Sequence, residues 1–340
     1  MVRYTNFHIV LFMLTSALSK AFTHRPINHA TTLTRTLSTT KSLMMKSNLL
    51  SIPECIERHG DSVFVDGSWH LSSRDGRIEY ETGPRIKGAH FLDIDDVGTK
   101  HEKNLPHMMP SKEVFANVMD KFDITPDTDV IFYGSEGCFS IPRAFYTFRA
   151  LGHAHAKVHL LDGSLVDWID ANGPTEIGPR ESFKAENLAT DGITKYKSSV
   201  DAINIVDINH VSIIVNSGEK SGSVIIDARS AGRFFGTEPE PRPGLRGGHM
   251  PGAFNVPFNI LLDDENKKFR PKEEMISIFR EAGVDVDTEK EIVCTCGSGV
   301  TACWLSLALE ECGRDPSKTF IYDGSWIDWA SDENTPVVLG

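Results

Sequence analysis

Three short motifs occur twice in this chain, in the same order and at a nearly constant offset of about 160 residues. Because such an ordered recurrence is hard to obtain by chance, it indicates two copies of one domain. At 340 residues the chain is long enough for both copies. The paired motifs are residues 63–66 with 224–227, residues 88–91 with 252–255, and residues 161–164 plus Trp168 with 322–325 plus Trp329.

Within each copy, short apolar runs alternate with helical patterns. This alternation is typical of a parallel sheet with helices on both faces, so we expect an α/β fold of two tandem domains. The expected domains are residues 51–172 and 199–340, joined by a polar linker, residues 173–198. The expected strands are residues 63–65, 130–133, 158–161, 224–227, 291–295 and 319–322, and the expected helices are residues 142–151, 272–282 and 300–311.

The N-terminal segment has the composition of a targeting signal, because basic side chains precede the first acidic residue, Glu54. Residues 8–18 are apolar and short, like the core of a signal peptide. Residues 22–47 are rich in Thr and Ser, like an organellar transit peptide. We therefore expect residues 1–47 to be removed and the protein to enter a mitochondrion or a plastid rather than be secreted. An unstructured tail is the alternative.

The net charge of −12 is uneven, since the basic N-terminal segment leaves the rest of the chain more acidic still. Such a body is not expected to bind nucleic acid, and the mature form is not expected to bind a membrane. The six cysteines include no Cys-x-x-Cys pair, and no histidine cluster has metal spacing. Neither a disulfide framework, nor a zinc site, nor another cofactor is expected.

A cysteine loop follows an expected strand of the second copy. Cys296 comes directly after residues 291–295, and two glycines allow the backbone to curl around its sulfur. Unpaired N–H groups at the start of the following helix favour a thiolate there. Aligning the copies puts Gly134 opposite Cys296, so we expect one active site per chain, in the second half. The loop reads Cys296-Gly297-Ser298-Gly299-Val300-Thr301.

On these motifs the chain closely resembles the tandem rhodanese-domain sulfurtransferases, and within them the 3-mercaptopyruvate type. The resemblance covers residues 51–338 and is carried by residues 232–242, 296–301 and 323–326. It implies a doubly wound fold in each half, an inactive first half and a cysteine persulfide. The implied reaction moves sulfur from 3-mercaptopyruvate to Cys296, releases pyruvate, and passes the sulfur to thioredoxin, glutathione or cyanide.

The resemblance also implies which residues bind the donor. Arg233 and Arg242 take the family's two substrate-binding positions, where a planar guanidinium can grip a carboxylate. From the residues alone, each could instead pair on the surface with Glu238 or Glu240. The remaining residues expected to bind substrate are Gly297, Gly299, Val300 and Thr301 of the cysteine loop.

A proton relay from both halves is the last implication of the resemblance. Its members are Ser298, His107 and Asp95, which together would deliver a proton to the leaving enolate or tune the thiolate. On the residues alone, loop capping by Asp95 and Ser298 and an interdomain hydrogen bond by His107 are the favoured explanation. With the resemblance, we expect the catalytic residues to be Cys296, Ser298, Asp95 and His107.

The loop composition separates the remaining alternatives. Gly297 and Ser298 are neutral, which favours 3-mercaptopyruvate over the dianion thiosulfate; thiosulfate is the alternative donor. A cysteine phosphatase or arsenate reductase would need an arginine at the end of the loop, where Ala302 stands. A non-catalytic binding module fits only the first half. A redox pair of Cys294 and Cys296 would require a strained disulfide, so Cys294 is expected in the core.

Overall fold

A computed structural model of the chain describes residues 47–71, 74–187, 194–198, 203–265 and 267–340. Except for Ser47, the predicted targeting segment lies outside the described residues. Within the described ranges, no helix combines the length and the apolar character needed to cross a membrane. The two halves pack together as one unit, so contacts between them belong to the fold.

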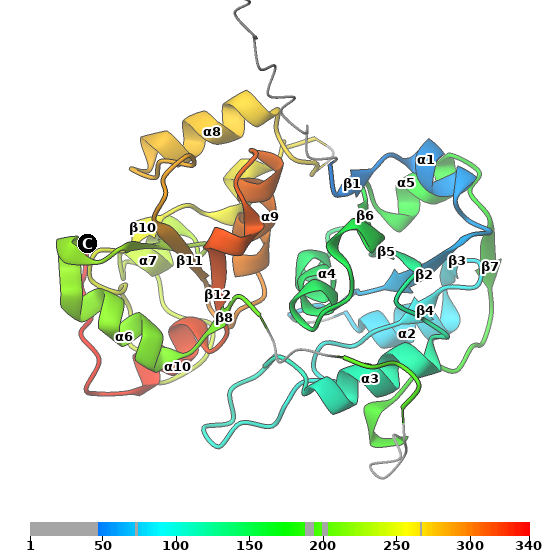
Figure 1. Ribbon diagram of the computed structural model, residues 1–340, viewed down its shortest axis with the longest axis horizontal. Coiled ribbons are helices and arrows are strands. Elements are labelled where there is room, and N and C mark those ends of the chain that lie inside the picture. The colour runs from blue at the N-terminus through cyan, green and yellow to red at the C-terminus, as the bar shows by residue number, and fades with distance from the viewer. Residues whose placement is uncertain (1–46, 72–73, 188–193, 199–202, 266) are drawn as a thin grey trace, which may run out of the picture. The chain divides into compact units, whose positions relative to one another are not determined.

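The first half is built on a five-stranded parallel sheet in the order β1-β6-β5-β2-β4 (Figure 1). Helices α3 and α4 pack on one face of this sheet, and α1 and α5 pack on the other. The elements are β1 (Leu49–Leu50), α1 (Ile52–Glu57), β2 (Ser62–Asp66), α2 (Gly76–Thr82), β4 (His90–Phe91), α3 (Lys112–Lys121), β5 (Asp129–Tyr133), α4 (Ile141–Ala150), β6 (Val158–Leu161) and α5 (Leu165–Asp170).

The second half repeats this arrangement with the parallel order β10-β9-β11-β12-β8. Here α8 and α9 pack on one face, and α6 and α10 pack on the other. The predicted α/β fold with two parallel sheets is therefore confirmed. The elements are β8 (Ile205–Val206), α6 (Ile208–Ser217), β9 (Ser223–Asp227), α7 (Ala231–Phe234), β10 (Phe254–Asn255), α8 (Lys272–Glu281), β11 (Glu291–Thr295), α9 (Ala302–Glu311), β12 (Thr319–Tyr322) and α10 (Ser325–Ser331).

The six predicted strands form at their expected places, and the predicted helices differ by one or two residues at their ends. The helix expected from residue 300 begins at Ala302, because Val300 and Thr301 stay in the cysteine loop. Four edge strands, β1, β4, β8 and β10, were not predicted, since two residues carry no periodic pattern. Short 3-10 helices lie at His155–Lys157, Ala185–Asn187, Gly218–Lys220, Phe258–Leu261 and Pro316–Lys318.

The segment predicted as a linker packs on the first half. Its strand β7 (Thr175–Ile177) pairs antiparallel with β3 (Pro84–Ile86). Farther along, the ring of Tyr196 lies edge-on to Phe115, with ring centres 5.8 Å apart. The described part of this segment thus adds to the first domain rather than hanging free.

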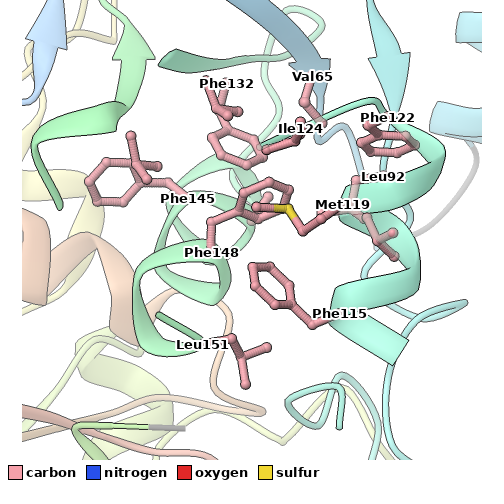
Figure 2. Close-up of a cluster of buried hydrophobic side chains, with 14 of the residues drawn as sticks. Val65, Leu92, Phe115, Met119, Phe122, Ile124, Phe132, Phe145, Phe148 and Leu151 are labelled. Carbon is pink, nitrogen blue, oxygen red and sulfur yellow. The ribbon is translucent and has the colours of Figure 1, made fainter. Parts of the chain in front are cut away.

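An aromatic cluster fills the space between the first sheet and helices α3 and α4 (Figure 2). Phe148 meets both Phe115 and Phe132 edge-on, at ring-centre distances of 5.2 and 4.8 Å. Such pairs contribute about 0.5–1.5 kcal/mol each beyond area burial. Val300 and Leu307 of the second half belong to the same buried cluster, so the cysteine loop is anchored in the core of the other domain.

Candidate active site

The predicted nucleophile, Cys296, lies directly after β11, at the carboxyl end of a central strand. In parallel α/β sheets, ligands bind in the crevice at this edge. Cys296 is only 2% exposed, yet it lines a cavity of about 270 Å³. Trp69, Leu71 and Phe139 of the first half form part of the cavity wall, so both halves enclose the site.

Hydrogen bonds from the start of α10 hold the cysteine loop. The Cys296 N–H donates to Ser325 Oγ (3.2 Å), while the Trp326 N–H donates to the Cys296 carbonyl (3.0 Å). The Ile327 N–H donates to the Gly297 carbonyl, also at 3.0 Å. Ser325 has a positive φ of 51°, which is uncommon for a residue with a side chain. The motif at residues 323–326 therefore holds the backbone of Cys296 through hydrogen bonds.

The N–H groups of residues 297–301 donate no hydrogen bond to any described residue. A run of unpaired N–H groups before a helix attracts an anion. Gly299 makes the curl possible, since its φ is +79° and a Cβ there would lie 2.8 Å from the Asp323 carbonyl oxygen. The loop can thus present N–H groups to a thiolate, a persulfide or a bound carboxylate.

The other five cysteines are poor nucleophiles because burial keeps them protonated. Desolvation raises the pKa of Cys303 to about 12 and the pKa of Cys312 to about 11. It also raises the pKa of Cys55 to about 12, and the thiol pKa values of Cys138 and Cys294. Cys294 is completely buried in the second core, as expected from the sequence.

Arg233 lines the cavity beside the loop. Its Nη2 atom donates to Glu240 Oε2 at 2.6 Å, and a Cβ at Gly297 would lie 2.9 Å from the same nitrogen. Glycine at position 297 therefore lets the guanidinium approach the nucleophile's backbone. The sequence left open whether Arg233 pairs with a glutamate or faces a substrate site. In the structure Arg233 does both: it pairs with Glu240 and lines the cavity.

Arg242 also lines the cavity, and it links the cavity to the predicted relay. Its Nη2 atom lies 3.4 Å from His107 Nε2 and donates to it when that nitrogen is unprotonated. His107 Nδ1 donates to Asp95 Oδ1. The histidine and the carboxylate come from the first half, and the arginine, which was not part of the predicted relay, comes from the second.

Asp95 is held as a carboxylate. Burial alone would raise its pKa, but the hydrogen bond and the charge of His107 lower the pKa below its usual value. The Trp69 Nε1–H donates to Asp95 Oδ2 at 2.6 Å, and the Trp69 ring packs edge-on to the imidazole at 4.5 Å. An ionised Asp95 keeps the proton of His107 on Nδ1 and leaves Nε2 as the acceptor.

Ser298, the third predicted relay member, lines the cavity but does not hydrogen-bond to His107 within the described structure. The serine link of the relay stays a prediction. Of the loop residues predicted to bind substrate, Gly297, Val300 and Thr301 line the cavity, whereas Gly299 turns its carbonyl toward Arg143 of the first half.

Arg229 is a third cavity arginine, and sequence reasoning missed it. Its fully buried guanidinium pairs with Asp227 (Nη2–Oδ2, 2.6 Å) and Glu240 (Nη1–Oε1, 2.8 Å). It also lies over the Trp326 ring, 4.2 Å from the ring centre. A comparison of the two copies could have found it, because the first copy has Ser68 at the position of Arg229.

Comparisons with known proteins agree with this geometry. The family model for the rhodanese-like domain matches residues 64–171 and 214–332. The 3-mercaptopyruvate sulfurtransferase of Mus musculus is 38% identical over 269 residues, covering 78% of this chain and 84% of the relative. In Arabidopsis thaliana, the mitochondrial thiosulfate/3-mercaptopyruvate sulfurtransferase 1 is 34% identical over 301 residues, covering 82% and 74%.

A solved structure shares the fold across nearly its whole length. The crystal structure of the Tum1 protein from Saccharomyces cerevisiae superimposes with a TM-score of 0.74 at 31% identity, covering 86% of this chain and 98% of that one. The two segments matched by the family model lie over the central strands of the two sheets described above and leave out the edge strands β1 and β8. The chain is therefore an enzyme of the tandem rhodanese-domain sulfurtransferase family.

Proposed function

We propose that this enzyme moves sulfur from 3-mercaptopyruvate through a persulfide on Cys296 to a thiol acceptor or cyanide. The observation that carries the proposal is the position of Cys296: it directly follows β11 and lines a cavity that three arginines also line. The name of the mouse relative supports 3-mercaptopyruvate as the donor. The neutral side chains at Gly297 and Ser298 support the same choice.

In the first half-reaction, the Cys296 thiolate attacks the sulfur of 3-mercaptopyruvate. An S–S bond forms and the C–S bond breaks, with the bonding electrons passing to the enolate of pyruvate. The proton carried by the donor's sulfur ends on the pyruvate methyl carbon, leaving an anionic persulfide. The free N–H groups of residues 297–301 are suited to stabilise that anion.

In the second half-reaction, the outer sulfur leaves Cys296. An acceptor thiolate attacks it and becomes a persulfide, or cyanide attacks it and becomes thiocyanate. In both cases the S–S bond breaks and Cys296 returns as a thiolate. Thioredoxin and glutathione are the proposed thiol acceptors, and both must reach the sulfur past Trp69, Leu71 and Phe139.

Arg233 and Arg242 are proposed to bind the donor's carboxylate. Arg233 is held in place by Glu240, and Arg242 lies beside His107. Replacing Arg233 by Gln should raise KM for 3-mercaptopyruvate about 10–100-fold, the range of a lost charge-assisted hydrogen bond. Equal losses with an uncharged sulfur donor would count against carboxylate binding.

The Asp95–His107 pair is proposed to manage the proton of the first half-reaction. His107 Nε2, which faces Arg242, is the nitrogen proposed to accept a proton, with Ser298 as the group between it and the donor. His107→Ala should therefore change the shape of the pH–rate profile. A profile that keeps its shape and only falls in height would remove the relay.

Thiosulfate is the second candidate donor, because the Arabidopsis relative is named for both donors. The ratio of kcat/KM for the two donors decides between them. We expect it to favour 3-mercaptopyruvate, since the loop itself carries no cationic side chain.

A single-turnover experiment tests the proposed function directly. Enzyme mixed with 3-mercaptopyruvate and no acceptor should release about one pyruvate per site and gain the mass of one sulfur atom on Cys296. The Cys296→Ser variant should do neither. Pyruvate release by that variant would overturn the assignment.

An organellar location fits the mitochondrial name of the Arabidopsis relative. We propose a mitochondrion or a plastid, with residues 1–47 removed and domains at residues 51–172 and 199–340. Ser47 Oγ and the Asn48 N–H both donate to Glu311, at 2.8 and 2.9 Å. N-terminal sequencing of the mature protein locates the cleavage, and cell fractionation separates the two organelles.

A further inference from the structure

Arg143 lies in α4 of the first half, far from the cysteine in sequence, and is 1% exposed. Its guanidinium reaches across the domain boundary. Nη1 donates to the Gly299 carbonyl of the cysteine loop (3.2 Å), and Nη2 donates to Asp323 Oδ1 (2.6 Å). Nη2 also donates to the carbonyl of His107. One side chain thus touches the cysteine loop and the relay histidine.

The two carbonyls that Arg143 binds belong to residues with unusual backbone conformations. His107 has a φ of +59° and Gly299 a φ of +79°. The left-handed region disfavours a residue with a side chain, so His107 must be held there by its surroundings. Arg143 binds the carbonyl of His107 and the carbonyl of Gly299, so it restrains the histidine and the cysteine loop together.

Asp323 completes the arrangement. Its Oδ1 atom accepts from Arg143, and its Oδ2 atom accepts from the Met109 N–H at 2.8 Å. Asp323 and Arg143 therefore hold both ends of the segment from His107 to Met109. Two residues farther on, Ser325 supports the Cys296 N–H.

We propose that Arg143, paired with Asp323, is a positioning residue that fixes the Cys296 loop relative to His107 and thereby makes the first domain necessary for catalysis. The inference rests on the proposed function. A planar guanidinium can bind two carbonyls and a carboxylate in fixed directions, which a lysine ammonium cannot reproduce. A loop displaced by about 1 Å can cost about 10²-fold in rate.

The second domain offers a matched control. Trp304 occupies the third position of α9, as Arg143 does in α4, and its Nε1–H donates to the Phe139 carbonyl of the first domain at 2.8 Å. This hydrogen bond also crosses the domain boundary, but it holds the loop that carries no nucleophile. Trp304→Phe removes it and keeps most of the packing.

The test compares Arg143→Met, Arg143→Lys and Trp304→Phe. With 3-mercaptopyruvate, we expect kcat to fall about 100-fold for Arg143→Met and about tenfold for Arg143→Lys, with KM changed less than about threefold. Trp304→Phe should stay within about threefold of the wild type in both. Thermal unfolding of each variant shows whether a loss of activity merely follows a loss of stability.

A second readout needs no sulfur donor. The rate at which iodoacetamide alkylates Cys296, followed by mass spectrometry across pH, reports how the loop holds its thiolate. We expect the pH midpoint of the alkylation rate to move in the Arg143 variants and to stay unchanged in Trp304→Phe. If the wild type released no pyruvate from 3-mercaptopyruvate, the proposed function would fail, while the alkylation profiles would still decide the role of Arg143.

Equal losses in Arg143→Met and Trp304→Phe would overturn the proposal, as would an effect confined to KM or an unmoved alkylation midpoint. If Arg143→Met does not fold, Arg143→Lys decides alone. Asp323→Asn should reproduce the direction of the Arg143 effects, because it removes the charge that orients the guanidinium.

Discussion

The two halves share a sheet topology, but only the second has a cysteine directly after its central strand. Gly134 follows β5 as Cys296 follows β11. A Cβ at Gly134 would lie 2.4 Å from Ile141 Cδ1, because a larger side chain opens α4 where Ala302 opens α9. The first loop therefore has glycine where the second has its thiol, and a side chain at position 134 would require Ile141 to move.

The buried aspartates at the ends of β2 and β9 differ in the same way. Asp227 is paired with Arg229. Asp66 accepts the Ser68 N–H and has no cation beside it, so burial raises its pKa to about 6. A cation at this strand end therefore distinguishes the catalytic half from its partner.

The repeated Asp-Gly-Ser motif has also diverged in role. Ser164 caps α5, and the Ser164 N–H donates in return to Asp167 Oδ2. Ser325 instead turns its hydroxyl to the Cys296 N–H. One contact is kept in both halves, since the Leu165 N–H donates to the Gly134 carbonyl as the Trp326 N–H donates to that of Cys296.

The largest expected effect comes from moving the thiol between the halves. Cys296→Ser should lower kcat on the order of 10³-fold or more, because covalent catalysis is lost. Adding Gly134→Cys to that variant should restore no turnover, since Ile141 fills the space beside residue 134 and Ser68 stands where the second half has Arg229. Steady-state pyruvate release measures both variants. Recovered turnover would contradict this expectation, because it would show that a cysteine in the first loop can act as the nucleophile.

The next effect is the loss of stability expected when Arg229 is removed. Arg229→Met leaves Asp227 and Glu240 buried without their shared partner, which should cost about 3–5 kcal/mol in the free energy of unfolding. Ser68→Ala, at the matching place in the first half, loses hydrogen bonds from the Ser135 N–H and to Asp66 rather than an ion pair, and should cost about 1 kcal/mol. Urea denaturation measures the free energy of unfolding of both variants. Similar losses would contradict the view that Arg229 contributes more to stability than Ser68 does.

Asp66 should make stability depend on pH. Because its pKa is raised from 3.8 to about 6 by burial, its stabilising contribution is complete below about pH 4 and is lost as the pH rises through about 6. Asp66→Asn removes this titration. Relative to the wild type, the variant should gain up to about 3 kcal/mol in the free energy of unfolding between pH 4 and pH 8.

Urea titrations at several pH values measure this gain. Asp227→Asn is the comparison, and it should be destabilised because Arg229 loses its partner carboxylate. A difference between Asp66→Asn and the wild type that does not change with pH would show that Asp66 is ionised in the folded protein throughout.

The smallest effect separates the two serines. Ser164→Ala should cost about 1 kcal/mol of stability through the lost helix cap and leave activity unchanged. Ser325→Ala should cost about 1–3 kcal/mol, since it leaves the buried Cys296 N–H unpaired, and it should also lower kcat. Paired stability and rate measurements test this, and unchanged kcat in Ser325→Ala would contradict a supporting role for its hydroxyl.

Much of the fold could be predicted because it depends on local patterns. Apolar runs of four or five residues marked the central strands, and the repeat marked the two domains. The two-residue edge strands could not be predicted, because they exist only through pairing with a neighbour such as β6 or β12. The first residue of α9 was also missed, since the loop's packing into the first domain decides where the helix begins.

The sequence by itself predicted Cys296 as the nucleophile, the first copy as inactive and the two motif arginines as donor-binding residues, because each lies within a short run whose spacing carries its meaning. Only the tertiary structure decided that Arg229 and Glu240 lie beside Arg233, and that Arg143 joins His107 to Gly299. His107, Arg143 and Gly299 are far apart along the chain, and no local pattern records a contact between them. They meet because the fold brings the two halves together and buries charged side chains between them, where each needs a partner.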